Sequence, residues 1–253
     1  MSVSNISVEV QNCVASITFA HPKHNCFPQE QLQVLTKAIS QCATDTGVHV
    51  LLLQSDPSKA FCAGASFDEL MEIKTPEQGK TFFMGFANLI NAMRECSKPI
   101  VGRIHGKAIG GGVGIVAACD YAIATQNADV RLSELAIGIG PFVISPAVSR
   151  KIGTAALAAL ALQPKAWKSA NWALQHGLFT ELHSDFDAAN LAAVDLAHQL
   201  ASYAPKAVSE LTKALWKDTS HWSELLPKHA EISGELLLLP ETQLTLKQLK
   251  SNS

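Results

Sequence analysis

KPIVGRIHGKAIGGGVGIVAACD, residues 98–120, decides the fold because it has the pattern of a strand, a glycine turn and a helix of small apolar residues. Three consecutive glycines let the backbone adopt torsions that a side chain forbids. The helix that follows leaves its first N–H groups without partners inside the helix. Such amides bind an anion, either a phosphate or a negative oxygen that forms during a reaction. The stretch therefore predicts an anion-binding turn at an active site.

The glycines fit neither of two common phosphate-binding motifs. A dinucleotide-binding fingerprint counted from Gly110 needs a third glycine where the chain has Ile115. A Walker loop that contains Lys107 needs a glycine in place of Val101 and a Ser or Thr in place of Ala108. On the glycines alone, a turn that serves only close packing stays open.

A second segment helps to decide whether the glycine turn binds an anion or serves only close packing. The sequence AFCAGASFDEL at residues 60–70 follows the apolar run VHVLLLQ at residues 48–54. Together with the Lys-Pro-Ile and glycine motifs of residues 98–120, this segment resembles the enoyl-CoA hydratase/isomerase (crotonase) superfamily over roughly residues 5–215. The resemblance implies an α/β fold, the crotonase-like spiral of ββα turns. It also implies a core domain at residues 1–195 and a C-terminal helical region at residues 196–253 for trimerisation and for covering the acyl pocket.

The resemblance assigns two backbone donors. In the family, an oxyanion hole is formed by the N–H after the glycine of the first motif and by the N–H of the middle glycine of the second, here Ala65 and Gly111. The two donors would polarise a thioester carbonyl and stabilise the enolate. The resemblance also implies contacts with the substrate or its coenzyme A at further positions, namely Lys23, His24, Cys26, Ala63, Gly64, Ser66, Phe67, Gly110, Gly114 and Phe142. For Lys23, a solvated surface lysine is an equally good interpretation.

Glu134, in the segment VRLSELAIGIGPF at residues 130–142, is the expected acid or base. In the family, the glutamate a few residues before the glycine of such a segment points at the α and β carbons of the substrate. A carboxylate among Leu132, Leu135 and Ile137, in a pocket poor in water, gains proton affinity, which suits proton transfer near neutral pH. The alternative is a solvated glutamate near a turn.

One position departs from the family pattern. The best-known hydratases carry a second glutamate three residues after the oxyanion glycine, where this chain has Gly114 between apolar neighbours. Two reactions with a single base stay open: a hydration in which another group holds the water, and an isomerisation that moves a proton between the α and γ carbons. The run PFVISPAV at residues 141–148 is similar to hydratases of the methylglutaconyl-CoA type, which favours hydration. Phe142 stands where dienoyl-CoA isomerases place an acid.

Hydrophobic periodicity predicts the elements around these motifs. Alternation predicts a β-hairpin over residues 6–19 and helical spacing predicts helices over about 28–43 and 76–96. The second helix carries an apolar stripe that we expect in the core and in the wall of the acyl pocket. Residues 121–125 are expected to form a buried strand. The chain from Ala147 onward is expected to be helical, except that the segment ALQHGLFTE at residues 173–181 is similar to the family's run toward its last strand. Strands and helices in alternation favour an α/β arrangement.

Composition sets the outer bounds. The 253 residues are 47% apolar and 17% charged, enough for one large domain or for a domain with a helical appendage. A net charge of −2, without clusters of Lys or Arg, gives no reason to expect nucleic acid or a membrane as partner. Six separated cysteines without a C-x-x-C pair indicate reduced thiols. Residues 1–5 lack a signal-peptide pattern and no long apolar run follows, so a cytoplasmic protein is expected.

Metal and hydrolytic chemistry fit the sequence poorly. His21 and His24 lack a carboxylate or cysteine at ligand spacing, so no metal is expected. Ser133, His105 and Asp120 are the residue types of a hydrolytic triad, but no G-x-S-x-G turn presents a serine as nucleophile.

The sequence therefore predicts an enoyl-CoA hydratase that adds water across the 2,3 double bond of an enoyl-CoA thioester. An isomerase with a single glutamate base and a non-catalytic acyl-CoA-binding protein are the alternatives, and Glu134 argues against the second. No cofactor is expected apart from coenzyme A as part of the acyl-CoA substrate. The resemblance implies a homotrimer, or a hexamer of two trimers.

Overall fold

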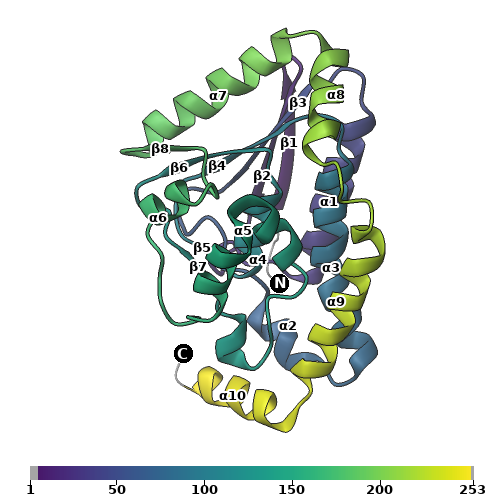
Figure 1. The fold of residues 1–253 in the computed structure, drawn as a ribbon, viewed down its shortest axis with the longest axis vertical. Helices are drawn as coiled ribbons and strands as arrows, with labels where there is room; N and C mark the ends of the chain where they lie inside the picture. Colours follow the sequence, from purple (N-terminus) through teal and green to yellow (C-terminus); the bar gives the residue numbers. More distant parts are fainter. Residues whose placement is uncertain (1–4, 252–253) are drawn as a thin grey trace.

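The structure, a computed structural model that describes residues 5–251, has a mixed α/β fold around one central sheet (Figure 1). The sheet has six strands in the order β1-β2-β3-β4-β6-β8. Only β1 and β2 are antiparallel neighbours, and every other pair is parallel. The strands are β1 (Asn5–Gln11), β2 (Val14–Ala20), β3 (Val50–Ser55), β4 (Ile100–Ile104), β6 (Tyr121–Thr125) and β8 (Glu181–His183). The predicted α/β class is confirmed.

The predicted hairpin is the antiparallel edge of the sheet. Its two turn residues, Asn12 and Cys13, have φ angles of 49° and 62°, the left-handed conformations that match the twist of a two-residue hairpin. Parallel neighbours cannot be joined by so short a turn and need crossover connections, which helices supply here. The chain order of the sheet thus follows from one hairpin and a series of crossovers.

Helices cover both faces of the sheet. On one face lie α1 (Gln29–Thr44) and α3 (Pro76–Glu95), and on the other lies α7 (Phe186–Ser202) (Figure 1). Strand β3 is apolar along nearly its whole length, as expected for a parallel strand that is buried on both sides. Val50 and Leu52 face the small residues Ala189 and Ala193 of α7. This three-layer packing fixes the strand ends from which the site is built.

The apolar stripe of α3 is buried as predicted, at Phe82, Phe83, Phe86, Leu89, Ile90 and Met93. Helix α9 (Trp222–Leu237) packs along α3 at backbone contact. A Cβ on Gly79 would lie only 2.7 Å from the Cα of Gly234, so the crossing requires a glycine. The C-terminal part of the chain is thereby fastened to the helix that carries the pocket wall.

Two short strands and a 3-10 helix near the glycine turn were not predicted. Strands β5 (Ala108–Ile109) and β7 (Val130–Arg131) pair in parallel as a small second sheet, and the 3-10 helix η1 (Glu134–Ile137) follows. Two residues are too few for any hydrophobic period, so the sequence gives no signal for them. Strand β5 leads directly into α4 (Gly111–Ala118), the small apolar helix expected after the glycine turn.

The remaining helices complete the cover of the core. They are α2 (Phe67–Glu72), α5 (Ser145–Ala161), α6 (Ala170–Gln175), α8 (Pro205–Leu215) and α10 (Pro240–Ser251). The domain boundary expected after residue 195 lies inside α7. Within residues 5–251, no helix is both long enough and apolar enough to cross a bilayer.

Candidate active site

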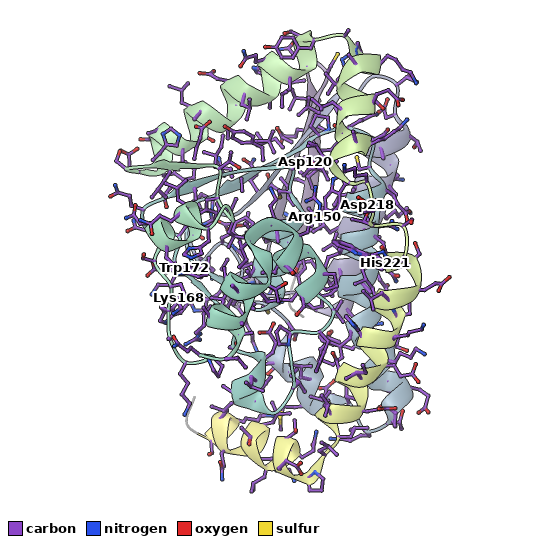
Figure 2. The ribbon with its side chains drawn as sticks, viewed as in Figure 1. Asp120, Arg150, Lys168, Trp172, Asp218 and His221 are labelled. Carbon is purple, nitrogen blue, oxygen red and sulfur yellow. The ribbon has the colours of Figure 1, made fainter. Side chains whose placement is uncertain are left out.

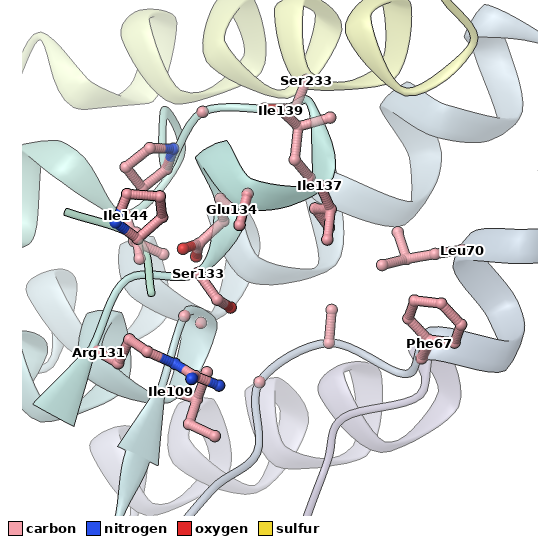
Figure 3. Close-up of a pocket in the computed structure, with 18 of the residues that line it drawn as sticks. Phe67, Leu70, Ile109, Arg131, Ser133, Glu134, Ile137, Ile139, Ile144 and Ser233 are labelled. Atoms are coloured by element: carbon pink, nitrogen blue, oxygen red, sulfur yellow. The ribbon is translucent and has the colours of Figure 1, made fainter. Parts of the chain in front are cut away.

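A cavity of about 830 Å³ lies where the two sequence motifs meet (Figure 3). Its walls come from the loop before α2, from α3, from the turn between β5 and α4, from η1 and its following loop, and from α9 and α10. The lining includes Ala63, Gly64, Ala65, Phe67, Phe83, Phe86, Gly110, Gly111, Arg131, Ser133, Glu134, Phe142, Ile144, Lys165, Ser233, Thr245, Gln248 and Leu249. From the apolar stripe of α3, Phe83 and Phe86 line this space, while the other residues of the stripe pack in the core.

Backbone contact holds the two motifs together. The N–H of Ile109 donates to the carbonyl of Cys62 at 2.9 Å. Gly64 has a φ of +85°, and a Cβ there would lie 2.9 Å from the carbonyl oxygen of Ile109 and 3.6 Å from the nitrogen of Gly111. Both the backbone torsion and the contact exclude a side chain. The glycine of the first motif thus brings Ala65 close to the glycine turn of the second.

Ala65 and Gly111 carry N–H groups that the fold leaves free. Neither N–H donates to a protein acceptor within residues 5–251, although neighbouring amides do. Ser66 donates to the carbonyl of Phe27 at 2.9 Å, and Gly111, the first residue of α4, has no earlier turn of helix to bond to. Both residues line the cavity. The two N–H groups that the sequence selected are thus available to a ligand.

Glu134 is the acid in the lining of this cavity. It begins η1, and its carboxylate lies against Gly110: a Cβ on Gly110 would be 2.8 Å from Oε1. Its Oε2 is buried and has no hydrogen-bond partner among the described residues. Burial raises the pKa of Glu134 to about 7, although the N–H groups of Ser133 and Glu134 itself act in the opposite direction. A carboxyl group with this pKa exchanges protons readily near neutral pH.

At Gly114, where the best-known hydratases have a second glutamate, the side chain of Ile144 fills the space. A Cβ on Gly114 would lie 2.4 Å from Cγ2 and 2.6 Å from Cβ of Ile144. Ile144 belongs to the cavity lining and Gly114 does not. An apolar side chain therefore occupies the space that a carboxylate at position 114 would need, and Ile144 rather than Gly114 lines the cavity here.

Five of the other expected contact residues line the cavity: Ala63, Gly64, Phe67, Gly110 and Phe142. Four lie outside the lining. Lys23 is exposed and forms an ion pair with Asp68. Cys26 is buried beside His21, with its Sγ 3.2 Å from Nδ1, and burial raises its pKa to about 11.

The last two of these outlying residues have local structural roles. His24 is exposed with a φ of 52°, and its carbonyl accepts the N–H of Ala63 at 3.1 Å. Ser66 caps α2, where its hydroxyl accepts the N–H of Glu69 at 3.4 Å. The Ser-x-x-Glu pattern of a helix start was present in the sequence and could have identified this role.

Several lining residues had no signal in the sequence. Helix α10 folds over the cavity, and Thr242 donates its hydroxyl to the carbonyl of Gly138 at 3.2 Å, just after η1. Thr245, Gln248 and Leu249 of this helix line the cavity, a contribution that the sequence left unassigned because the resemblance fades there. These contacts join segments more than a hundred residues apart, and local patterns do not report such contacts.

The residue types of a hydrolytic triad are dispersed. His105 has its Nε2 2.9 Å from the carbonyl of Lys59. Asp120 (Figure 2) accepts hydrogen bonds from the N–H of Ile100 at 2.8 Å and from Nε1 of Trp216 at 2.7 Å, while Ser133 faces the cavity. Ser133, His105 and Asp120 therefore do not form a catalytic triad. The described residues also contain no group of three or more His, Cys, Asp or Glu side chains that would hold a metal ion.

Sequence comparison connects this geometry with known proteins. The family model for enoyl-CoA hydratase/isomerase matches residues 9–245. A short-chain-enoyl-CoA hydratase from Clostridium acetobutylicum is 29% identical over 217 residues, which are 85% of this chain and 82% of that protein. A probable enoyl-CoA hydratase from Bacillus subtilis is 33% identical over 151 residues, and this match spans 59% of the chain and only 58% of the relative.

Structural comparison gives the same result for the fold. The crystal structure of an enoyl-CoA hydratase from Bacillus halodurans superposes with a TM-score of 0.89 at 22% sequence identity, over 96% of this chain and 99% of that one. The crotonase-like fold expected from the two motifs is therefore confirmed.

Proposed function

Because the chain belongs to the enoyl-CoA hydratase/isomerase family, we propose that it adds water across the 2,3 double bond of an enoyl-CoA thioester. The observation that carries the proposal is the buried Oε2 of Glu134, which has no hydrogen-bond partner within residues 5–251. It lies in the cavity that is also lined by Ala65 and Gly111, whose N–H groups those residues leave unbonded. A hydration needs such an acceptor for the attacking water. The relative from Clostridium acetobutylicum, named a short-chain-enoyl-CoA hydratase, supports the same reaction.

The two N–H groups supply the electrophile in this proposal. The thioester oxygen accepts both, and the bonds strengthen as negative charge moves onto that oxygen in the enolate. Removal of one such donor typically costs roughly a hundred- to a thousandfold in rate. Since the amides stabilise the enolate, the reaction requires no metal or redox cofactor, and coenzyme A takes part only as a portion of the substrate.

Glu134 moves the proton. Its carboxylate takes a proton from water as the hydroxyl oxygen bonds to C3, and the electron pair of the double bond moves towards the thioester oxygen. The enolate then takes the proton from Glu134 at C2, which restores the carboxylate and completes the addition. The pKa of about 7 lets one residue act first as base and then as acid without a large free-energy cost in either direction.

Isomerisation is the second candidate, favoured by the contact between Gly114 and Ile144. The apolar Ile144 leaves no space for the carboxylate that would hold a water from the opposite side. A single carboxylate that takes a proton from C4 of a 3-enoyl thioester and returns it at C2 needs no water at all. Both reactions use Glu134 and the two N–H groups, so they differ only in what Oε2 contacts.

A pair of substrates separates the candidates. With 2-hexenoyl-CoA, hydration removes the absorbance of the conjugated thioester and adds the mass of one water. With 3-hexenoyl-CoA, isomerisation creates that absorbance at unchanged mass. Greater turnover of 2-hexenoyl-CoA with water uptake supports the proposal, whereas turnover of 3-hexenoyl-CoA alone would replace it with the isomerase. Binding of both thioesters without conversion of either would leave the acyl-CoA-binding protein as the function.

A further inference from the structure

Arg131 places a cation in the cavity that the proposed reaction does not use. Its guanidinium lies at the edge of the cavity beside Ile109 and Ser133 (Figure 3). The charged residues of the lining are Arg131, Lys165 and Glu134. Since burial holds the pKa of Glu134 near 7, the lining carries an excess of positive charge at neutral pH. The hydration of a neutral acyl chain does not require this charge.

The guanidinium lacks the partners that the other arginines have. Arg94, Arg103 and Arg150 each donate from the guanidinium to a protein oxygen. Arg131 forms no ion pair within residues 5–251, and its Nε is buried without a hydrogen-bond partner. A buried donor without a partner is costly, so the Nε of Arg131 needs a partner that the described residues do not supply.

The side chain is also held in place. The guanidinium carbon of Arg131 lies 4.5 Å from the centre of the Trp167 ring, and the Nζ of Lys107 lies 4.7 Å from the same centre. Stacking on an aromatic face orients the planar guanidinium and leaves its edge free, which is the edge that binds a carboxylate with two hydrogen bonds. The arrangement is thus that of an oriented anion receptor.

Position decides which anion. The carbonyl of Arg131 accepts the N–H of Gly110 at 2.9 Å, so its backbone is bonded to the residue before Gly111 and lies three residues before Glu134. The phosphates of coenzyme A are separated from the thioester by the long pantetheine arm, whereas a carboxylate on a short acyl chain lies a few bonds from it. A cation beside the reacting groups therefore fits the acyl carboxylate better than the phosphates.

We propose that Arg131 binds a carboxylate of the acyl group, so that the protein prefers enoyl-CoA thioesters of dicarboxylic acids to those of neutral acids. This inference rests on the proposed function, since it assumes that the thioester lies between Ala65 and Gly111. It adds a specificity-determining residue to the site. The pairing would be charge-assisted and bidentate, and hydrogen bonds of this type are worth roughly a ten- to hundredfold in affinity.

The test compares glutaconyl-CoA with 2-pentenoyl-CoA, which has the same carbon chain without the second carboxylate. Dissociation constants are measured by calorimetry on Glu134→Gln protein, in which turnover is suppressed, with and without Arg131→Met. We expect Arg131→Met to weaken glutaconyl-CoA at least roughly tenfold more than 2-pentenoyl-CoA, and Arg131→Lys to restore part of that difference. Lys107→Met is the matched control, because it removes the other cation from the Trp167 ring without touching the lining.

Two results would overturn the inference. Equal weakening of both thioesters and of free coenzyme A would assign Arg131 to the phosphates, and an unchanged preference would remove Arg131 from recognition. Retained binding of 2-pentenoyl-CoA shows that the variant is folded. The binding measurement does not depend on turnover, so the two proposals can fail separately. If glutaconyl-CoA binds more tightly than 2-pentenoyl-CoA but the wild type converts neither thioester, the proposed function is contradicted and the role of Arg131 in binding stands.

Discussion

The carboxylate of Glu134 lies directly against the Cα of Gly110, so close that a Cβ on Gly110 would stand 2.8 Å from Oε1 and 3.3 Å from Cδ. Gly110 precedes Gly111, whose free N–H faces the same cavity. The proposed acid–base group and one of the two proposed oxyanion donors are therefore positioned by a single backbone turn. Any change in that turn moves both.

Gly110→Ala tests this relationship. The new methyl group would displace the carboxylate, and the φ of 53° at Gly110 is unfavourable for alanine. A displacement of about 1 Å typically costs roughly a hundredfold in rate, so kcat should fall by that order. Gly106→Ala is the matched control, since its Cβ would meet no atom closer than 3.5 Å. Equal kcat values for the two variants would contradict the positioning role of Gly110.

The pH dependence of kcat/KM follows from the pKa of Glu134. Burial raises this pKa to about 7, and the deprotonated carboxylate is the form that takes a proton from water. Activity should therefore increase as the pH rises through about 7 and then level off. The measurement is kcat/KM from pH 5 to 9 with a neutral enoyl-CoA. If kcat/KM instead increases near pH 4.5, the ordinary pKa of a glutamate, the carboxylate that acts as the base is not buried.

The same shift in pKa predicts a pH-dependent cost to stability. The folded-state pKa of Glu134 is raised, so folding favours the protonated form: this contribution is complete below about 4.5 and is lost as the pH rises through about 7. Over that range the wild type should lose about 3 kcal/mol relative to Glu134→Gln, which cannot ionise. Urea unfolding of both proteins at pH 5 and pH 8 measures the difference. A gap between them that does not change with pH would contradict the burial of this carboxylate.

Gly114→Glu restores the carboxylate of the family pattern but meets Ile144. Because even a Cβ at position 114 would lie 2.4 Å from that side chain, the single variant should lose about 1–3 kcal/mol of stability. In combination with Ile144→Gly, the new glutamate has room, and hydration should gain roughly tenfold over isomerisation. Ile144→Gly alone separates the effect of added space from that of the carboxylate. If the double variant has the same ratio of hydration to isomerisation as Ile144→Gly alone, this explanation of the glycine at position 114 is contradicted.

Much of this arrangement was predictable because its signals are local. The hairpin alternates over residues 6–19, the stripe of α3 repeats at helical spacing, and the two glycine motifs mark places where the backbone comes too close for a side chain. Glu134 lies at the cavity as expected, but of the three apolar neighbours on which that expectation rested only Ile137 lines the cavity with it, and Leu135 is exposed. The signals for these features lie in short stretches of the chain, which a sequence displays directly, although the contacts that the glycines allow join distant residues.

The unpredicted parts depend on distant contacts. Strands β5 and β7 have two residues each and exist only because they pair with each other. The loss of space at Gly114 depends on Ile144, thirty residues later, and Thr242 of α10 reaches η1 from the far end of the chain. No motif in the sequence singles out Arg131, and what distinguishes it is the cavity around it and the absence of an acidic partner within residues 5–251.

The most direct test of the account is deuterium transfer by the wild type and by Glu134→Gln. Both proteins are incubated with crotonyl-CoA and 3-methylglutaconyl-CoA in heavy water, and the products are followed by absorbance and mass spectrometry. We predict uptake of one water with deuterium at C2 by the wild type, and a rate lower by roughly a hundred- to ten-thousandfold in Glu134→Gln, with unchanged binding. A Glu134→Gln protein as active as the wild type would contradict the central role of Glu134.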